Sequence, residues 1–187
     1  MKQNPVLVIS GPSGVGKGTV IAALLALHPE YGWSVSCTTR PIRPGEVNGK
    51  DYYFLSQSEF FKKQQAGDFA EWALVHGNHY GTSRSELLEK QSRYRVVIVE
   101  VDVQGAQALK TSGVLLKSIF LLPPDLETLA QRLDKRGTET EASFKKRLQN
   151  SADEIKMKDQ FDYQVVSLTV PKTVAHIESI IEREFGI

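Results

Sequence analysis

The segment VLVISGPSGVGKGT, residues 6–19, constrains the fold more than any other part of the sequence. Its first five residues, VLVIS (Val6–Ser10), are typical of a buried strand, and four glycines follow at Gly11, Gly14, Gly16 and Gly18. Glycine lets the backbone turn tightly and approach a ligand closely. Because residues 18–27 have the composition of a helix, the sequence predicts a strand, a glycine-rich loop and a helix in succession.

The loop has the composition of an anion-binding site. Backbone N–H groups of such a loop, with a helix N-terminus behind them, surround an anion, and Lys17 adds a positive charge on a flexible side chain. This context favours a phosphate-binding P-loop over a glycine-rich turn with a solvated lysine. The loop hydroxyl comes one residue later than usual, at Thr19. We therefore expect Thr19 to contact a phosphate, and magnesium to be held by the nucleotide and water.

Composition excludes several functional classes. The 187 residues, 41% of them hydrophobic, suffice for one core and suggest one domain. With 23 Lys and Arg against 22 Asp and Glu, the net charge is +1, so we expect no nucleic acid or membrane partner. The N-terminus does not resemble a signal peptide, and apolar runs are too short to span a membrane. A single cysteine, Cys37, suits a reducing compartment, and we predict a cytoplasmic protein.

The remaining sequence alternates between strand and helix patterns. Strands are expected at residues 33–37, 69–75, 94–102, 115–122 and 163–167, and helices at 58–65, 85–91, 104–110, 125–135, 141–158 and 174–185. This alternation predicts an α/β fold with a parallel sheet covered on both faces. Residues 40–82 interrupt it with turn signals and aromatic residues, which indicates a small, mostly antiparallel insertion with a turn at 76–81. The residues RGTET, 136–140, are expected to form a mobile joint between two charged helices.

Two further segments suggest what the protein binds in addition to the ligand of the glycine-rich loop. In TTRPIRPGEVNGKDYYF, residues 38–54, Arg40 and Arg43 are followed by Tyr52, and two guanidinium groups with a phenol can surround one phosphate. In VVIVEVD, residues 96–102, Glu100 and Asp102 point to the same face at the carboxyl end of a strand, where ligands bind in such sheets.

These segments, together with GNHYGT and RGTETEASFKKRL, resemble the guanylate kinase family, which transfers the γ-phosphate of ATP to GMP. The resemblance runs from the P-loop to about Gln149. It implies a P-loop NTPase-type parallel sheet flanked by helices, with a small mixed α/β GMP-binding insertion and a helical lid. The expected parts are a core of residues 1–35, 83–125 and 159–187, the insertion 36–82, and a lid at about 126–158. The implied cofactor is Mg²⁺ bound with ATP, and the chain is expected to be a monomer or a homo-oligomer.

The resemblance also implies roles for individual residues. It assigns ATP binding to Gly11, Pro12, Ser13, Gly14, Val15, Gly16, Lys17, Gly18 and Thr19. It assigns GMP binding to Ser36, Arg40, Arg43, Tyr52, Glu71, Tyr80, Thr82 and Asp102. It assigns catalysis to Lys17, Arg40, Arg132, Arg136 and Arg147. Glu100 is the candidate for ordering the water molecules of the metal ion, and no direct metal ligand is expected.

The chemistry of guanine agrees with this assignment. Guanine presents N1–H and an exocyclic amine side by side, so the carboxylate of Glu71 can accept from both. Adenine would leave that carboxylate unpaired. Thr82 stands where many family members have serine, and Ser167 stands where the family usually has an asparagine near adenine, which leaves the adenine contact open. A phosphate oxygen of GMP is already a nucleophile, so we expect positioning and electrostatic stabilisation without a general base.

Two alternatives remain open at this stage. The chain could be a non-catalytic binding module with the same fold, although such modules typically lose the basic residues that this chain keeps. It could also be a related kinase with another phosphorylated acceptor, against which Ser36, Glu71 and Thr82 argue.

Overall fold

The computed structural model describes residues 4–75, 77–134 and 141–187. The expected joint at 136–140, including Arg136, lies outside these residues. The chain divides into two compact units: unit 1 is formed by the residues up to Val8 together with Pro29–Leu116, and unit 2 by Ile9–His28 and Lys117–Ile187. Each unit is described in turn.

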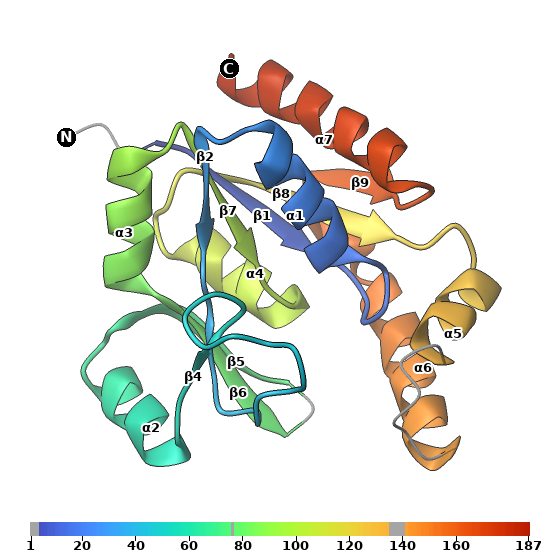
Figure 1. Cartoon of the computed structure of the whole chain (residues 1–187), viewed down its shortest axis with the longest axis horizontal. Helices are drawn as coiled ribbons and strands as arrows, with labels where there is room; N and C mark the ends of the chain where they lie inside the picture. Colours follow the sequence, from blue (N-terminus) through green and yellow to red (C-terminus); the bar gives the residue numbers. More distant parts are fainter. Residues whose placement is uncertain (1–3, 76, 135–140) are drawn as a thin grey trace. The chain divides into compact units, whose positions relative to one another are not determined.

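Helices and strands follow one another along the chain, with strict alternation interrupted at β2–β4, β5–β6 and α5–α6 (Figure 1). The strands are β1 (Val6–Ser10), β2 (Tyr31–Ser34), β3 (Cys37–Thr38), β4 (Tyr53–Phe54), β5 (Phe69–Val75), β6 (Asn78–Ser83), β7 (Val96–Glu100), β8 (Leu116–Leu122) and β9 (Tyr163–Val166). The helices are α1 (Lys17–Leu27), α2 (Gln57–Gln65), α3 (Arg84–Arg93), α4 (Val103–Thr111), α5 (Leu126–Asp134), α6 (Glu141–Ile155) and α7 (Val170–Phe185), with a short 3₁₀ helix at Lys158–Gln160.

The predicted fold class is confirmed. Five strands form a parallel sheet in the order β2-β7-β1-β8-β9, and four more form a second sheet in the order β4-β3-β6-β5. Residues 6–9 of β1 and 96–99 of β7 are fully buried. Continuous apolar runs of this kind are typical of parallel strands that are covered on both faces.

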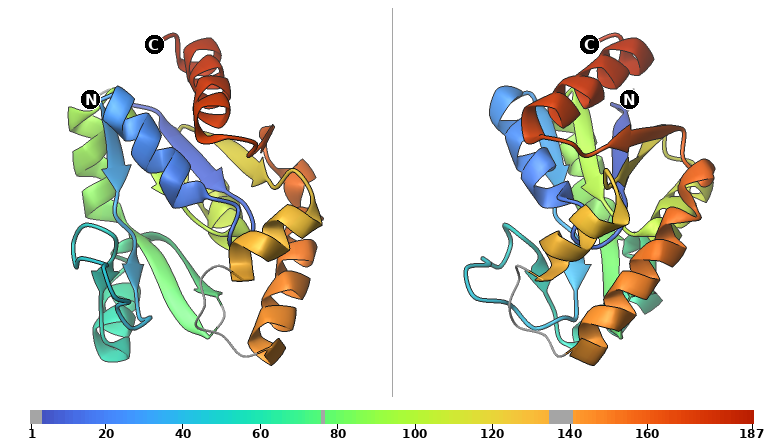
Figure 2. Two further views of the ribbon diagram at one scale, coloured as in Figure 1. Left: turned by 45° about the vertical axis from the view of Figure 1, so that its right-hand side comes forward. Right: turned by 90° about the vertical axis from the view of Figure 1, so that its right-hand side faces the viewer.

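Unit 1 contains the second sheet, which belongs to the predicted insertion. Strands β5 and β6 form an antiparallel hairpin, drawn in green in Figure 2, and β6 also pairs antiparallel with β3. Strand β3 pairs with β4 in parallel, so the sheet is mixed. Helix α2 begins with a capping box in which Ser56 and Glu59 each satisfy the backbone of the other.

The strand predicted at residues 33–37 is wrong in its bounds. Tyr31–Ser34 pairs with β7 in the parallel sheet, whereas Cys37–Thr38 pairs in the second sheet. Between them, the amide of Val35 donates to the Glu86 carboxylate at 3.0 Å instead of to a neighbouring strand. The chain therefore passes from one sheet to the other within a segment whose composition looks continuous.

The turn predicted at residues 76–81 is also wrong in extent. Asn78–Ser83 is strand β6, paired residue by residue with β5, and Gly77 has φ 82° beside the turn. Turn-forming residue types in this segment are overridden by the pairing with β5. The same pairing places Gly81 inside the hairpin.

The described part of unit 2 contains β9, all of β8 except Leu116, and helices α1, α5, α6 and α7. Strands β8 and β9 pair in parallel, and α1 lies beside α7 (Figure 1). Helix α7 begins at Val170, ahead of the predicted start at 174, because Pro171 in its first turn favours a helix N-terminus. Helix α6 ends at Ile155, before the predicted end at 158.

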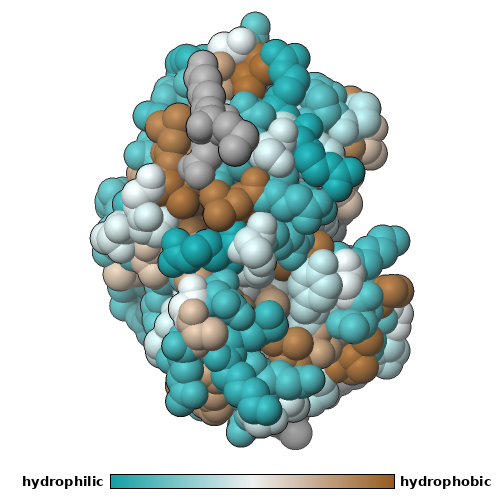
Figure 3. All heavy atoms as spheres, turned by 90° about the vertical axis from the view of Figure 1, so that its left-hand side faces the viewer, coloured by the Kyte–Doolittle hydropathy of each residue, from teal (hydrophilic) through white to brown (hydrophobic). Residues whose placement is uncertain are grey.

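Apolar side chains also reach the surface. On the face that Figure 3 shows, which carries α2 and α3, they lie in several patches among hydrophilic side chains. Phe61 on α2 and Leu88 on α3 are examples from these helices. Scattered exposure of this kind is normal for folded proteins. Within the described ranges, no helix is both long enough and apolar enough to cross a membrane.

Candidate functional site

The glycine-rich loop of unit 2 follows the predicted path from β1 into α1. Gly11 has φ 144°, and a Cβ atom there would lie 2.5 Å from the carbonyl oxygen of Leu121 on β8. Gly14 has φ 85°, and a Cβ atom there would lie 2.7 Å from a methyl carbon of Leu133 on α5. These two positions require glycine both for backbone conformation and for space.

The N-terminus of α1 faces this loop. Its N-cap is Gly16, with φ 103°, and no side chain caps the first turn. The amides of that turn are consequently available to an anion. Lys17 donates from Nζ to the carbonyl oxygens of Gly11 at 2.7 Å and Pro12 at 3.3 Å, so the ammonium group lies over the loop. Thr19 is exposed in the same turn.

Two basic side chains of the predicted lid segment lie at the loop. Arg132 on α5 donates to the Val15 carbonyl at 3.0 Å and to the Ser167 carbonyl at 3.2 Å. Arg147 on α6 donates to the Ser13 hydroxyl at 2.8 Å. The structure therefore brings Arg132 and Arg147 to the loop, whereas Arg136 lies outside the described residues.

Ser167 has a structural contact that sequence analysis missed. Its buried hydroxyl donates to the Val15 carbonyl at 3.0 Å, the same oxygen that accepts from Arg132, and its amide donates to Leu122 at 2.7 Å. The loop carbonyl is thus held by two side chains that are distant from it in the sequence. No local signal in the sequence marks this pairing.

Unit 1 contains a buried acid on the hairpin. Glu71 is 5% exposed, and its Oε1 accepts a hydrogen bond from the Thr82 hydroxyl at 2.6 Å. Burial raises the pKa of Glu71 to about 7; the Thr82 hydrogen bond opposes this rise, and nearby Asp102 adds to it. This carboxyl group can change its charge near neutral pH.

Three other predicted residues lie in the same unit. Asp102 is the N-cap of α4 and accepts from the Gly105 amide at 2.9 Å. Ser36 is buried, and its hydroxyl donates to the Glu100 carbonyl at 3.5 Å. Glu100 ends β7 and is half-buried.

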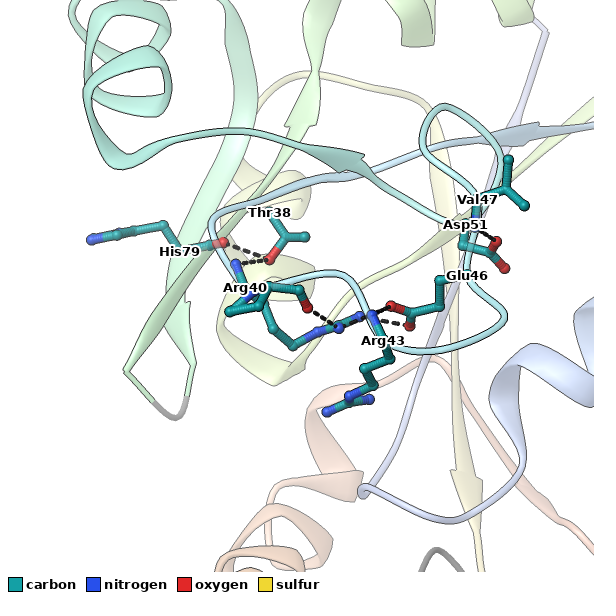
Figure 4. A network of polar contacts seen from close by, with 8 residues as sticks. Thr38, Arg40, Arg43, Glu46, Val47, Asp51 and His79 are labelled. Carbon is teal, nitrogen blue, oxygen red and sulfur yellow. Dashed lines mark hydrogen bonds and ion pairs between the residues drawn. The ribbon is translucent and has the colours of Figure 1, made fainter. Parts of the chain in front are cut away.

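The predicted phosphate-binding group (Arg40, Arg43, Tyr52 and Tyr80) is built around Arg40, which is buried. Its guanidinium lies 5.4 Å from the ring centre of Tyr52 and 5.5 Å from that of Phe54, and the rings of Tyr52 and Tyr80 are 5.9 Å apart. Arg43 is exposed, and its side chain points away from Glu46 in Figure 4. The structure therefore gathers Arg40 and two phenols, with Arg43 nearby on the same loop.

Glu46 is a further member that sequence analysis missed. Its carboxylate accepts from both terminal nitrogens of Arg40, at 3.0 and 2.7 Å, and from the Arg43 amide at 2.8 Å (Figure 4). Although burial opposes its charge, these hydrogen bonds lower the pKa of Glu46. Glu46 therefore binds Arg40 through two parallel N–H···O hydrogen bonds, which fix the orientation of the guanidinium. In the sequence, Glu46 lies between Arg43 and Tyr52, and this position is the signal that could have identified it.

A parallel sheet whose strand β1 leads through a glycine-rich loop into a helix N-terminus without a side-chain cap is the arrangement of P-loop nucleotide kinases. The family model described as guanylate kinase matches residues 3–184. The chain therefore belongs to the guanylate kinase family.

Individual relatives agree with this placement. The guanylate kinase of Clostridium tetani is 45% identical over 184 residues, covering 98% of this chain and 88% of the relative. That of a Nostoc species is 45% identical over 170 residues, covering 89% of this chain and 85% of the relative. The crystal structure of guanylate kinase from Anaplasma phagocytophilum superposes with a TM-score of 0.82 at 32% identity, covering 99% of this chain and 88% of that one.

Proposed function

We propose that the chain transfers the γ-phosphate of ATP to GMP, giving ADP and GDP. The observation that carries this proposal is the buried Glu71 carboxyl group, bonded to Thr82 in the same unit as the Arg40 anion site. The family match and the names of the relatives support it.

Glu71 selects guanine in this proposal. Guanine offers two neighbouring N–H donors to the two carboxylate oxygens. The Ser36 hydroxyl can donate to guanine O6, and the Thr82 hydroxyl, whose single proton is donated to Glu71 in the free protein, would turn from Glu71 to do the same. Adenine has an acceptor at N1 and no 2-amino group, so it would leave a buried charge without partners. Sites that depend on hydrogen bonds reject such ligands strongly.

Arg40 and Arg43, with the phenols of Tyr52 and Tyr80, bind the GMP phosphate. Three of the five N–H donors of Arg40 donate to Pro41 and Glu46, and this holds the guanidinium in one orientation. Such preorganisation lowers the entropy cost of binding an anion. Asp102 completes the GMP-binding set.

The loop of unit 2, Gly11–Thr19, binds the phosphates of ATP through backbone amides. Lys17, Arg132, Arg136 and Arg147 neutralise charge on the transferring phosphoryl group. A GMP phosphate oxygen attacks without a general base. Because Ser167 donates to the Val15 carbonyl, its role in this proposal is to support the loop. Whether Ser167 also contacts adenine does not change that role.

Mg²⁺ enters with ATP in this proposal and, when bound, neutralises charge on its phosphates. Within the described residues, no group of three or more His, Cys, Asp or Glu side chains that could hold a metal ion is found. In this proposal Thr19 contacts a phosphate, and Glu100 would act through the ion's water molecules.

Residues 36–82 serve as the GMP-binding part and residues 126–158 as the lid. The buried free thiol of Cys37 supports a reducing, cytoplasmic location. We expect a monomer or homo-oligomer without a nucleic acid or membrane partner.

The test is to incubate the purified protein with ATP, Mg²⁺ and GMP, AMP, CMP or UMP, and to separate the nucleoside diphosphates by anion exchange. GDP should form at least about a hundredfold faster than the other products at equal concentrations. Binding of GMP without GDP formation would instead indicate a non-catalytic module. Comparable rates with all acceptors would contradict the assigned selectivity.

A further inference from the structure

Gly105 lies in the first turn of α4 and has a backbone conformation that other residues can also adopt. Gly105 is buried within α4, outside the left-handed region. A glycine within a helix is less favourable than alanine, because it loses more backbone entropy on folding. The benefit of glycine at this position therefore lies in its lack of a side chain.

The space that the missing side chain leaves is filled by the Glu71 carboxyl group. A Cβ atom at Gly105 would lie 2.7 Å from Oε2 of Glu71, and 3.1 Å from Oδ1 of Asp102 and from Cβ of Val101. A separation of 2.7 Å is too short for such a contact, so one of the groups would have to move.

The Glu71 carboxyl group has little freedom to move away. Its other oxygen accepts from Thr82 at 2.6 Å, its residue is 5% exposed, and α4 packs against the strand that carries it. The amide of Gly105 is itself held by Asp102 at 2.9 Å. A methyl group at position 105 would therefore turn or displace the carboxylate within a closed environment.

We propose that Gly105 is a specificity-determining positioning residue, because its lack of a side chain sets the place of the Glu71 oxygen that faces α4. This inference rests on the proposed function, in which both carboxylate oxygens receive N–H donors of guanine. Gly105 acts through Glu71 and touches no reacting atom.

The variant Gly105→Ala tests the proposal. The KM for GMP should rise roughly ten- to a hundredfold, because a charged hydrogen bond to guanine is lost or misdirected. The KM for ATP should stay within about twofold. Gln104→Ala, at an exposed position of the same turn, is the matched control and should leave both constants unchanged.

A double variant separates this role from a general packing defect. Glu71→Asp withdraws the carboxylate by one methylene, so adding Gly105→Ala in that background should change the KM for GMP by less than about twofold. If Gly105→Ala alone does not fold, folding of the double variant would support the contact, and failure of the double variant to fold would overturn it.

Two outcomes overturn the inference. One is an unchanged KM for GMP in folded Gly105→Ala. The other is an increase in the KM for GMP that Gly105→Ala causes to the same extent in the parent protein and in Glu71→Asp. Failure of the proposed function is distinguishable, since the parent protein would then form no GDP in the same assay.

Discussion

At the scale of single residues, Lys17 is held entirely within its own loop. Its ammonium group donates to Gly11 and Pro12 in unit 2, whereas the residues assigned to GMP lie in unit 1. Lys17→Met should therefore lower kcat by at least roughly a hundredfold while leaving GMP affinity within a few-fold. Steady-state kinetics and titration calorimetry with GMP measure the two effects. A parallel loss of GMP affinity would contradict the placement of Lys17 on the transferring phosphate.

Glu71 makes stability depend on pH. Burial raises its pKa from 4.5 to about 7, so the folded state holds a proton that the unfolded chain has released in this interval. The stabilisation is complete below pH 4.5 and is lost as pH rises towards about 7, by up to about 3 kcal/mol. Urea denaturation between pH 4.5 and 8 should show this fall in the parent protein and a flatter profile in Glu71→Gln. Identical profiles for the two proteins would contradict the pKa.

At the scale of elements, the loop after β1 depends on a segment far along the chain. Ser167→Ala removes one of two donors to the Val15 carbonyl and should cost about 1 kcal/mol of unfolding free energy. Because the loop would be less well positioned, the KM for ATP should rise a few-fold while GMP affinity is retained. Ser179→Ala, on the exposed side of α7, is the control. Unchanged stability and unchanged ATP kinetics would show that this contact is dispensable.

Most elements were predictable because their periodicity and ends are local properties of the sequence. The run of β1 and the glycines after it predicted a strand, a loop and a helix, and all three are confirmed. The strand predicted at 33–37 is divided because its two halves pair in different sheets, which composition does not reveal. Asn78–Ser83 is a strand because it pairs with β5, against its turn-forming residue types.

The candidate site was predictable to a similar extent. Residues that share a motif, such as Arg40 and Tyr52, come together as expected. The partners of these residues were missed where they depend on tertiary packing. Gly105 meets Glu71 only because α4 packs on the hairpin, and Ser167 meets Val15 only in the folded unit 2. Glu46 was missed although it lies in the same motif, because an exposed salt bridge and a phosphate-site contact look alike in sequence.

At the scale of the whole molecule, we expect motion during the proposed reaction, because a site that excludes water must open to release its products. GMP is assigned to residues of unit 1 and ATP to residues of unit 2, and transfer of a phosphoryl group requires the two phosphates to meet while water is excluded. Small-angle scattering should show a smaller radius of gyration with GMP, and a further decrease with GMP plus a non-hydrolysable ATP analogue. The same radius of gyration in all three states would contradict closure and leave the assignment of phosphotransfer unchanged.

Glu71 gives the most direct test of the proposed function, because its buried carboxylate is assigned the selection of GMP as the phosphate acceptor. The most direct test compares kcat/KM for GMP between the parent protein and Glu71→Gln, with Glu89→Gln on α3 as an exposed control. We expect a fall of at least roughly a hundredfold in Glu71→Gln, because the amide places a donor against a guanine donor, and no change in the control. Unchanged kinetics with GMP in folded Glu71→Gln would contradict the claim.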